Sequence, residues 1–337
     1  MTRKPDNPPD AGAPRRRLAL AVALALMLLW GSNYSVQKAV MAQIGPDALV
    51  FARYLVTPAC AVALLLWRHG WRWPKLERRD WLGLAGLAAL GHVAHVNVMT
   101  QAMHLSTAFS SALISALGPM FTLLLVHVLH SQRFTRLQLG GVALAMAGVL
   151  VFLSDKFTWS ALPSPIGLWH GLAGEPPVTL PGRTQGLGDL LLLLAALLFS
   201  AHTVAASRLF SRHGVTLVMA YTTLLAMVPM LLINAPQALQ VPWASLPAAI
   251  WWGLLWSLAV ASFAGWLAWG WLNDHLGVAR TAPLLYLLPP VAGFISWLAL
   301  GETFSALKIA GAVMAGVGVA ATQFSYSPAD APRHRSP

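Results

Sequence analysis

The residues best suited to chemistry in this sequence are polar side chains set inside long apolar runs. Trp30, Asn33 and Gln37 are spaced by three and four residues, so they share one face if the run is helical. Phe199 and His202 repeat the first of these spacings in a second apolar run. A polar side chain in such a setting is costly unless it faces a cavity or a hydrogen-bonding partner. We expect Asn33 and His202 to face one shared cavity; the alternative is interhelical hydrogen bonding.

A third apolar run carries two further polar faces. Asn97, Gln101 and His104 are spaced by four and three, whereas His92 and His95 fall on a different face. Imidazole titrates near physiological pH, so histidine is suited to carry protons. The candidates for proton coupling are His92, His95 and His202. Two histidines three apart could also hold a metal ion, but no Asp, Glu or Cys nearby completes a ligand set, so we expect no metal and no other cofactor.

Three other residues are unusual for their surroundings. Arg53 is a cation well inside an apolar run: it either reaches the interface or pairs across helices, or it receives an anionic group such as a carboxylate. Tyr286 precedes Pro289 and Pro290, a pair expected to kink the helix, either at a cavity wall or as static packing. Trp266 could stack on a flat apolar ligand. The candidate ligand-binding residues are Trp30, Asn33, Gln37, Arg53, Asn97, Gln101, His202, Trp266 and Tyr286.

The composition shows which elements must position these residues. Of 337 residues, 57% are hydrophobic and only 10% are charged, with a mean hydropathy of +0.63. A chain so poor in charge cannot cover a soluble surface, so the pattern predicts an all-α integral membrane protein and excludes a soluble enzyme. The net charge of +11 is better explained by cytoplasmic loops than by nucleic-acid binding. The single cysteine, Cys60, excludes an intramolecular disulfide.

Ten apolar segments are long enough to span a bilayer. They fall at about 18–40, 47–67, 82–103, 107–129, 137–154, 188–207, 215–234, 246–272, 279–300 and 306–323. Residues 155–187 form a Pro-rich linker that is too interrupted to be an eleventh span. Residues 1–17 are expected to be a disordered tail, and 324–337 a second tail.

The distribution of basic residues predicts the orientation of these spans. With the amino terminus inside, 17 of the 22 Lys and Arg residues lie on the cytoplasmic side. Because Lys and Arg are retained in cytoplasmic loops, both tails are expected in the cytoplasm and the 155–187 linker outside. This places the chain in a cell membrane as a multi-pass protein.

The two halves of the chain are similar to each other. His104 to Pro119 aligns with His275 to Pro290 at an offset of 171. After a one-residue slip, Gly141 and Gly148 match Gly311 and Gly318. Five spans per half is an odd number, so the second half, 188–323, should be inverted relative to the first, 18–154.

These features resemble the EamA domains of the drug/metabolite transporter superfamily. The resemblance rests on Leu29-Trp30-Gly31-Ser32-Asn33-Tyr34, on Arg53, on Pro119, and on Gly301-Glu302 followed by Gly311, and it covers Leu18 to Gln323. It departs from the family at Gln132, which stands where a symmetric partner of Glu302 would be, and in its longer linker. Pro119, Pro289, Pro290, Glu302 and Gly311 are expected to have structural roles, Glu302 by capping or ion pairing.

The resemblance implies a secondary transporter that moves a small organic solute, with export of an amino acid or related metabolite favoured. It also implies that the glycine-rich spans can support a homodimer. The alternatives are a channel or an integral membrane transferase. The motifs G-x-x-x-x-G-K-[ST], G-x-S-x-G and H-E-x-x-H are absent, which argues against ATP coupling and against an enzyme.

Overall fold

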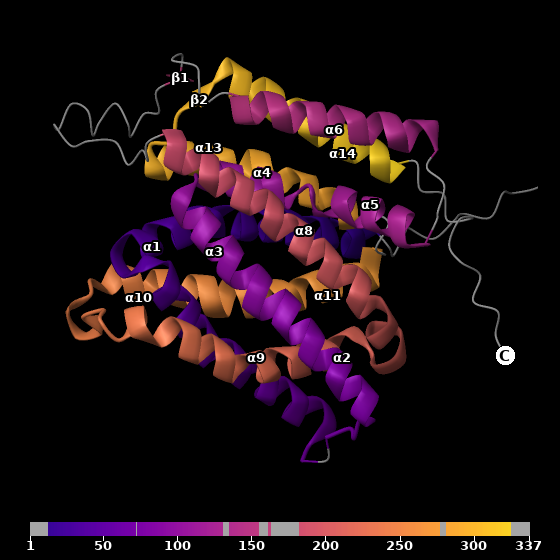
Figure 1. The fold of residues 1–337 in the computed structure, drawn as a ribbon, viewed down its shortest axis with the longest axis vertical. Coiled ribbons are helices and arrows are strands. Elements are labelled where there is room, and N and C mark those ends of the chain that lie inside the picture. Colours follow the sequence, from indigo (N-terminus) through magenta and orange to yellow (C-terminus); the bar gives the residue numbers. More distant parts are fainter. Residues whose placement is uncertain are drawn as a thin grey trace, which may run out of the picture.

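The computed structural model describes residues 13–71, 73–130, 135–154, 161–162, 182–276 and 281–324, and over these it is a helical bundle (Figure 1). Within them, seven helices are long and apolar enough to cross a membrane, and two shorter apolar helices, Leu284–Leu300 and Ala306–Thr322, follow. The chain is therefore an all-α, multi-pass membrane protein, as the composition predicts. Gln132 and most of the 155–187 linker lie outside the described residues.

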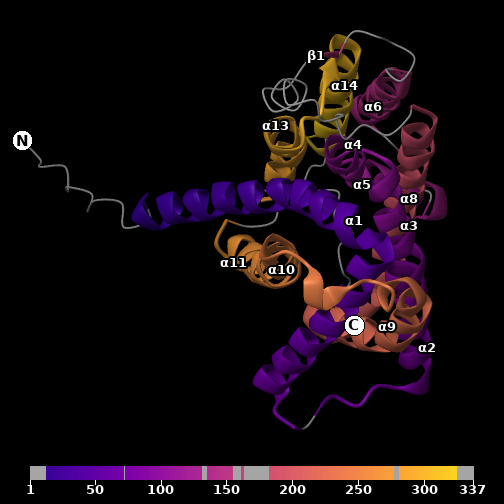
Figure 2. The ribbon, with the colours of Figure 1, turned by 90° about the vertical axis from the view of Figure 1, so that its left-hand side faces the viewer.

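The first helix, α1 (Ala13–His69), contains two predicted spans joined by a sharp break at Gly45. Gly45 has φ 79° and ψ 165°, a conformation that only glycine adopts without strain. Pro46 follows, where its fixed φ suits the first turn of the next helical part. Figure 2 shows the two parts of α1 running in different directions from this bend.

Two long helical segments of the bundle are each interrupted by a π-helix. The first is built from α2 (Arg78–Ala88), the π-helix η1 (Ala89–Ala94) and α3 (His95–Leu105). The second is built from α10 (Ala248–Leu255), the π-helix η4 (Trp256–Ala264) and α11 (Gly265–Leu276). Because a π-helix takes more residues per turn, side chains before and after each segment no longer follow one 3.6-residue register.

The remaining helices follow the predicted spans, except that spans 107–129 and 279–300 are each divided into two helical segments. In chain order they are α4 (Ala108–Ser115), α5 (Gly118–His130), α6 (Arg136–Ser154), α8 (Gly182–His213), α9 (Val215–Ala238), the 3-10 turns η3 (Trp243–Ser245) and η5 (Ala282–Leu287), α13 (Leu288–Leu300) and α14 (Ala306–Phe324). Helix α8 begins at Gly182, so residues 182–187 of the expected linker are helical. Strands β1 (Ala161–Leu162) and β2 (Phe304–Ser305) form a short antiparallel pair that joins the linker to the start of α14.

The prolines lie where helices change character. Pro119 occupies the first turn of α5, just after α4 ends. Pro289 and Pro290 lie in the first turn of α13, where the 3-10 turn η5 gives way to α-helix. A first-turn proline costs no backbone hydrogen bond, so these residues set joints between helical segments.

Helices α6 and α14 pack closely against each other, with glycine at each point of contact. A Cβ on Gly148 would lie 2.8 Å from the carbonyl oxygen of Gly311, and one on Gly141 would lie 2.7 Å from that of Gly318. From one contact to the next, the residue number rises along α6 and falls along α14, so the two helices are antiparallel. Figures 1 and 2 show them side by side. Only glycine permits so close a backbone approach.

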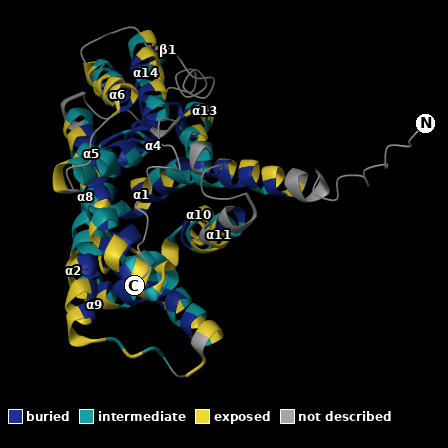
Figure 3. Cartoon of the chain, turned by 90° about the vertical axis from the view of Figure 1, so that its right-hand side faces the viewer, coloured by how far each residue is buried: buried dark blue, intermediate teal, exposed yellow. Residues whose placement is uncertain are grey.

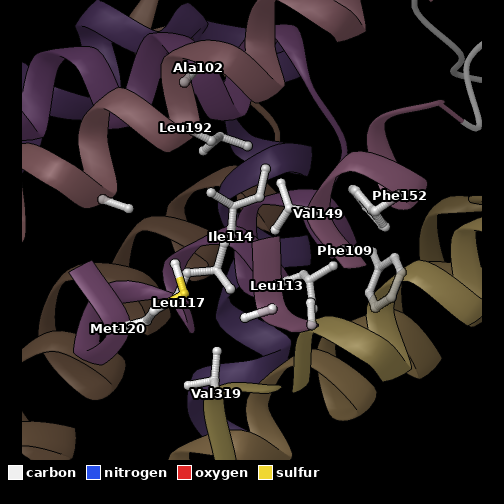
Figure 4. Packing of buried hydrophobic residues seen from close by; sticks show 13 residues of the cluster. Ala102, Phe109, Leu113, Ile114, Leu117, Met120, Val149, Phe152, Leu192 and Val319 are labelled. Atoms are coloured by element: carbon white, nitrogen blue, oxygen red, sulfur yellow. The ribbon is translucent and has the colours of Figure 1, made fainter. Parts of the chain in front are cut away.

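The largest buried cluster fills the space beneath this pair. Phe109, Ile114 and Leu117 from the α4 region meet Phe152 of α6 and Leu192 of α8 (Figure 4). In Figure 3, the residues coloured as exposed lie mainly on the outer sides of the helices, away from this core. Exposed leucines are numerous on these faces, as expected of helices whose surroundings are lipid.

Candidate functional site

A central cavity of about 910 Å³ lies among α1, α3, α4, α5, α8, α11 and the η5–α13 joint. Its lining includes Trp30, Asn33, Gln37, Arg53 and Tyr286, which the sequence analysis placed in a binding site. The first three line it together because their spacing by three and four puts them on one face of α1. The cavity is large enough for a small organic solute.

One wall of the cavity is aromatic. The rings of Trp30 and Trp269 lie 5.7 Å apart at an angle of 46°. Trp30 Nε1 donates a hydrogen bond to the carbonyl oxygen of Ala261, at 2.9 Å, within the π-helical segment η4. A Cβ on Gly265 would lie 2.5 Å from that same Nε1, so glycine lets α11 approach the indole. The indole is therefore held in place by η4 and α11 and presents a fixed apolar face.

Arg53 places a cationic side chain in the lining of the same cavity. Its Nη2 donates to Gln37 Oε1 at 2.8 Å, which ties the second part of α1 to the first. Arg53 Nε is buried without a hydrogen-bond partner, and the described residues provide no carboxylate for the guanidinium. Arg53 therefore pairs across the two helical parts of α1, which is the structural alternative for this residue, and its partner is a neutral amide and not a carboxylate. The cation thus keeps its charge at the cavity wall.

Asn33 and Ser115 add neutral polar groups to the same lining. Asn33 Oδ1 is buried and has no hydrogen-bond partner. A buried acceptor without a donor is costly, and such groups are rare in folded proteins. The wall near Arg53 therefore offers both a cationic donor and an unused acceptor.

Two predicted binding residues do not line the cavity. Asn97 donates to the carbonyl oxygen of Val93, at 2.7 Å, and contacts Met230 Sδ at 3.2 Å. Gln101 donates to Asp47 Oδ1 at 2.5 Å, joining α3 to α1. Both side-chain amides are engaged in contacts within and between helices, which is the structural alternative to binding a ligand. Trp266 lies on α11, but its side chain is outside what the structure describes.

His202 also does not line the cavity, contrary to the expectation that it faces the same space as Asn33. It is buried against η1: a Cβ on Gly91 would lie 2.3 Å from its Cδ2. Its Nε2 has no hydrogen-bond partner. The wall at this place is formed instead by Phe199 and Thr203, on the adjoining turns of α8.

The other two histidines lie behind the wall as well. His92 Nδ1 is 2.7 Å from the Tyr54 hydroxyl, and its Nε2 is 3.3 Å from Thr222 Oγ1. His95 Nδ1 donates to the carbonyl oxygen of Ala195 at 2.9 Å, and its ring lies 5.3 Å from that of Phe199. Phe199, against which His95 packs, lines the cavity. Among the described residues no group of three or more His, Cys, Asp or Glu side chains is arranged to hold a metal ion.

Sequence reasoning missed the role of Lys38 at one end of the cavity, just beyond Gln37. Its Nζ donates to the carbonyl oxygens of Met103, at 2.9 Å, and His104, at 2.7 Å, and also to that of Ser106. These are the unpaired carbonyls at the end of α3, where a cation is stabilised by the helix dipole. The Lys38 charge is thus satisfied by a helix terminus.

Glu302 makes the complementary contact on the other side of the same turn. Its carboxylate accepts from the backbone amides of Ala108, at 2.6 Å, and Phe109, at 3.2 Å, which open α4. Ser106 Oγ, between the two helices, donates to Asp189 of α8. The α3–α4 turn is therefore held by α1, by α8 and by the segment between α13 and α14. The geometry at Glu302 is that of a helix cap.

A second polar contact joins α2 to α8 at the far end of the bundle. The buried Asp80 pairs with Arg212 at 2.7 Å and with His213 at 2.8 Å. Charge-assisted pairs of this kind fix two helix ends together.

A polytopic helical bundle with a polar and aromatic cavity at its centre is the arrangement of a membrane transporter. Residues 17–154 and 186–323 each match the EamA-like transporter family, so this chain belongs to that family and carries two copies of its domain.

Similar proteins cover nearly the whole chain. A probable amino-acid metabolite efflux pump of Salmonella typhimurium is 24% identical over 90% of this chain and 94% of its own length. A probable terminal-alkyne amino-acid exporter of Streptantibioticus cattleyicolor is 26% identical over 90% and 93%. An uncharacterized transporter of Bacillus subtilis is 20% identical over 88% and 90%. A solved crystal structure, 18% identical, covers 91% of this chain and 99% of its own with a TM-score of 0.54, and shares the fold.

Proposed function

We propose that this protein is a secondary transporter that exports an amino acid or a related carboxylate metabolite by alternating access. The observation that carries the proposal is Arg53: a cation at the wall of the central cavity whose hydrogen-bonding partner is a neutral amide. A solute carboxylate would supply the missing opposite charge through a two-pronged contact with the guanidinium. The aromatic wall of Trp30 and Trp269 would receive the apolar part of the solute.

The proposal includes ten spans arranged as two inverted repeats. The α6–α14 contacts support it: Gly141 meets Gly318 and Gly148 meets Gly311. The sequence alignment pairs Gly141 with Gly311 and Gly148 with Gly318, so exchanging the two halves turns each contact into the other. A two-fold axis between antiparallel helices has this property. The π-helical segments, one in the third span of each half, support the same relation.

The placement of the polar contacts supports access from one side. The lining of the cavity follows α5 as far as Val126, toward the loop that the charge distribution assigns to the cytoplasm. At the other end, Lys38 and Glu302 hold the α3–α4 turn across the bundle. We infer that the structure is open to the cytoplasm, and that export requires this turn to be released and the cytoplasmic end of the cavity to close.

The histidines behind the wall are the proposed proton carriers. His95 packs against Phe199, which lines the cavity, and His92 contacts Tyr54, the neighbour of Arg53 in sequence. A solute at Arg53 and a proton at His92 would therefore act on neighbouring residues of α1.

Transport in proteoliposomes tests the proposal. A thermal-shift screen of amino acids and their amides would first identify a ligand, since a ligand that binds only the folded state stabilises it. Wild-type protein should then show saturable flux and counterflow of the carboxylate. A charge-assisted hydrogen bond contributes about 1.5–3 kcal/mol, so Arg53→Gln should weaken the apparent affinity for the carboxylate roughly 10- to 150-fold. Arg53→Lys should fall between, because it keeps the charge and loses the fork.

The matched control is Arg208→Gln, which removes an exposed arginine of α8 outside the cavity lining. It should transport as the wild type does. Equal transport of acid and amide by the wild type, or an unchanged affinity of Arg53→Gln, would leave Arg53 with a structural role only. Flux that neither saturates nor shows counterflow would indicate a channel.

A further inference from the structure

A second concavity, of about 540 Å³, lies at the surface between α9 and the extended segment 73–77 that precedes α2. It shares no residue with the central cavity. Its lining is mainly aromatic and aliphatic, with a single charged side chain. The residues that matter here are Trp73, Lys75, Trp81, Tyr221, Leu224 and Leu225.

The aromatic side of this groove is fixed by contacts within the protein. The Tyr221 ring lies 5.2 Å from that of Trp81 and 6.4 Å from that of Trp73. The Tyr221 hydroxyl donates to the carbonyl oxygen of Pro74 at 2.9 Å, which ties the extended segment to α9. The groove is therefore formed before any ligand arrives.

Lys75 gives the groove an unneutralised positive charge. Its side chain is exposed, and it has no acidic partner in the part of the chain that the structure describes. The two nearest acids in sequence, Glu77 and Asp80, are engaged elsewhere: Arg212 contacts both, at 3.8 and 2.7 Å. An anionic group entering the groove would meet Lys75 without competition from these carboxylates.

The surroundings of the groove are those of a membrane interface. Trp67 and Trp71, just before the segment, are 82% and 91% exposed, and exposed tryptophans gather where helices leave the hydrocarbon. Leu225 of α9 and Trp81 of α2, which line the groove, are also exposed. A free anionic metabolite would leave these apolar surfaces unused. A molecule with a phosphate and an acyl chain would use both.

We propose that this groove is a binding site for an anionic phospholipid, with its phosphate at Lys75 and one acyl chain along Leu224, Leu225 and Trp81. Basic residues beside membrane spans attract anionic lipids of the cytoplasmic leaflet, the side to which the charge distribution assigns this loop. The occupant is a lipid of defined charge seated between α9 and the 73–77 segment, rather than one of the many lipids around the bundle.

Native mass spectrometry of the detergent-solubilised full chain tests this proposal. The protein would be titrated with phosphatidylglycerol and, separately, with phosphatidylethanolamine of the same acyl chains. Wild-type protein should bind one phosphatidylglycerol more tightly than it binds phosphatidylethanolamine. Lys75→Ala should weaken that first binding event about fivefold, the effect expected of one basic residue at an anionic surface.

Two further variants separate a defined site from general attraction. Arg208→Ala removes the same charge from an exposed position of α8 outside the groove, and it should leave the first binding event unchanged. Leu225→Asn should weaken binding of the lipid while leaving Lys75 in place, whereas binding of glycerol phosphate, which has no acyl chain, should be too weak to detect. Equal losses in Lys75→Ala and Arg208→Ala, no preference of the wild type for phosphatidylglycerol, or binding of glycerol phosphate as tightly as the lipid would each overturn the assignment.

Discussion

Replacing Glu302 by glutamine should destabilise the protein because it weakens the capping of the first turn of α4. The carboxylate accepts from the first two amides of α4, at 2.6 and 3.2 Å, and is 8% exposed. Glutamine has one acceptor oxygen where glutamate has two. Its NH2 group is a donor, so it cannot accept the hydrogen bond of the second backbone N–H. One charge-assisted hydrogen bond is lost and one buried amide of α4 is left without its acceptor.

The size of the effect follows from these two contacts. Loss of a hydrogen bond to a charged group costs about 1.5–3 kcal/mol, and loss of a negative charge at a helix N-terminus adds about 0.3–1 kcal/mol. We therefore expect a decrease of about 2–4 kcal/mol in the free energy of unfolding. If one repeat melts as a unit of roughly 150 residues, the melting temperature falls by about 4–16 °C.

The matched control is Glu77→Gln, which makes the same chemical change at an exposed site. The Glu77 side chain is 73% exposed and meets Arg212 at 3.8 Å, so its removal should cost no more than about 0.5 kcal/mol. Thermal melts of both variants, followed by size-exclusion chromatography in the same detergent, would compare them directly. If Glu302→Gln melts together with Glu77→Gln, the carboxylate does not stabilise α4 and the capping argument is refuted.

Two other predictions concern the inverted arrangement and its orientation. Gly148→Ala places a Cβ 2.3 Å from the backbone nitrogen of Ala315, so α6 and α14 must separate. The melting temperature should fall by an amount equivalent to about 1–3 kcal/mol. Gly140→Ala, on the same helix with nothing within 4 Å of the added Cβ, should leave the melting temperature unchanged or raise it. In a Cys60→Ala background, cysteines placed in the 155–187 linker should react with a membrane-impermeant maleimide from outside, and cysteines at residues 208–214, where α8 ends, only from the cytoplasmic side. Linker labelling from the cytoplasm alone would reverse the orientation.

Much of the central cavity could be predicted from sequence because α1 is regular over the relevant stretch. Trp30, Asn33 and Gln37 follow the 3.6-residue period without interruption, so their shared face survives folding. The same spacing argument fails in the segment formed by α2, η1 and α3. There the π-helical segment 89–94 shifts the register just before His95, so faces assigned on either side of it do not continue one another.

The partners of the polar residues could not be predicted, since they lie on helices distant in sequence. Gln101 contacts Asp47, which its own helix does not reveal, and the spacing of Asn97 and Gln101 suits a cavity and a helix interface equally well. Lys38 lies 65 residues before the first carbonyl that it contacts. Whether a polar face meets a cavity or another helix depends on packing that the periodicity of one helix does not contain.

The charged side chains inside the bundle differ in how they are satisfied, and the difference bears on the proposed solute. Lys38 is matched by carbonyls at the end of α3, and Glu302 by amides at the start of α4, so each charge meets the opposite pole of a helix dipole. Arg53 has no such partner among the described residues: one amide oxygen accepts from it while its Nε is left unpaired. A charge in a membrane span that the fold leaves uncompensated is retained at a cost to stability. In the proposed transport cycle, a carboxylate in the cavity would compensate the charge of Arg53 while it is bound, and the cycle would further require this contact to be weaker in the outward-open conformation.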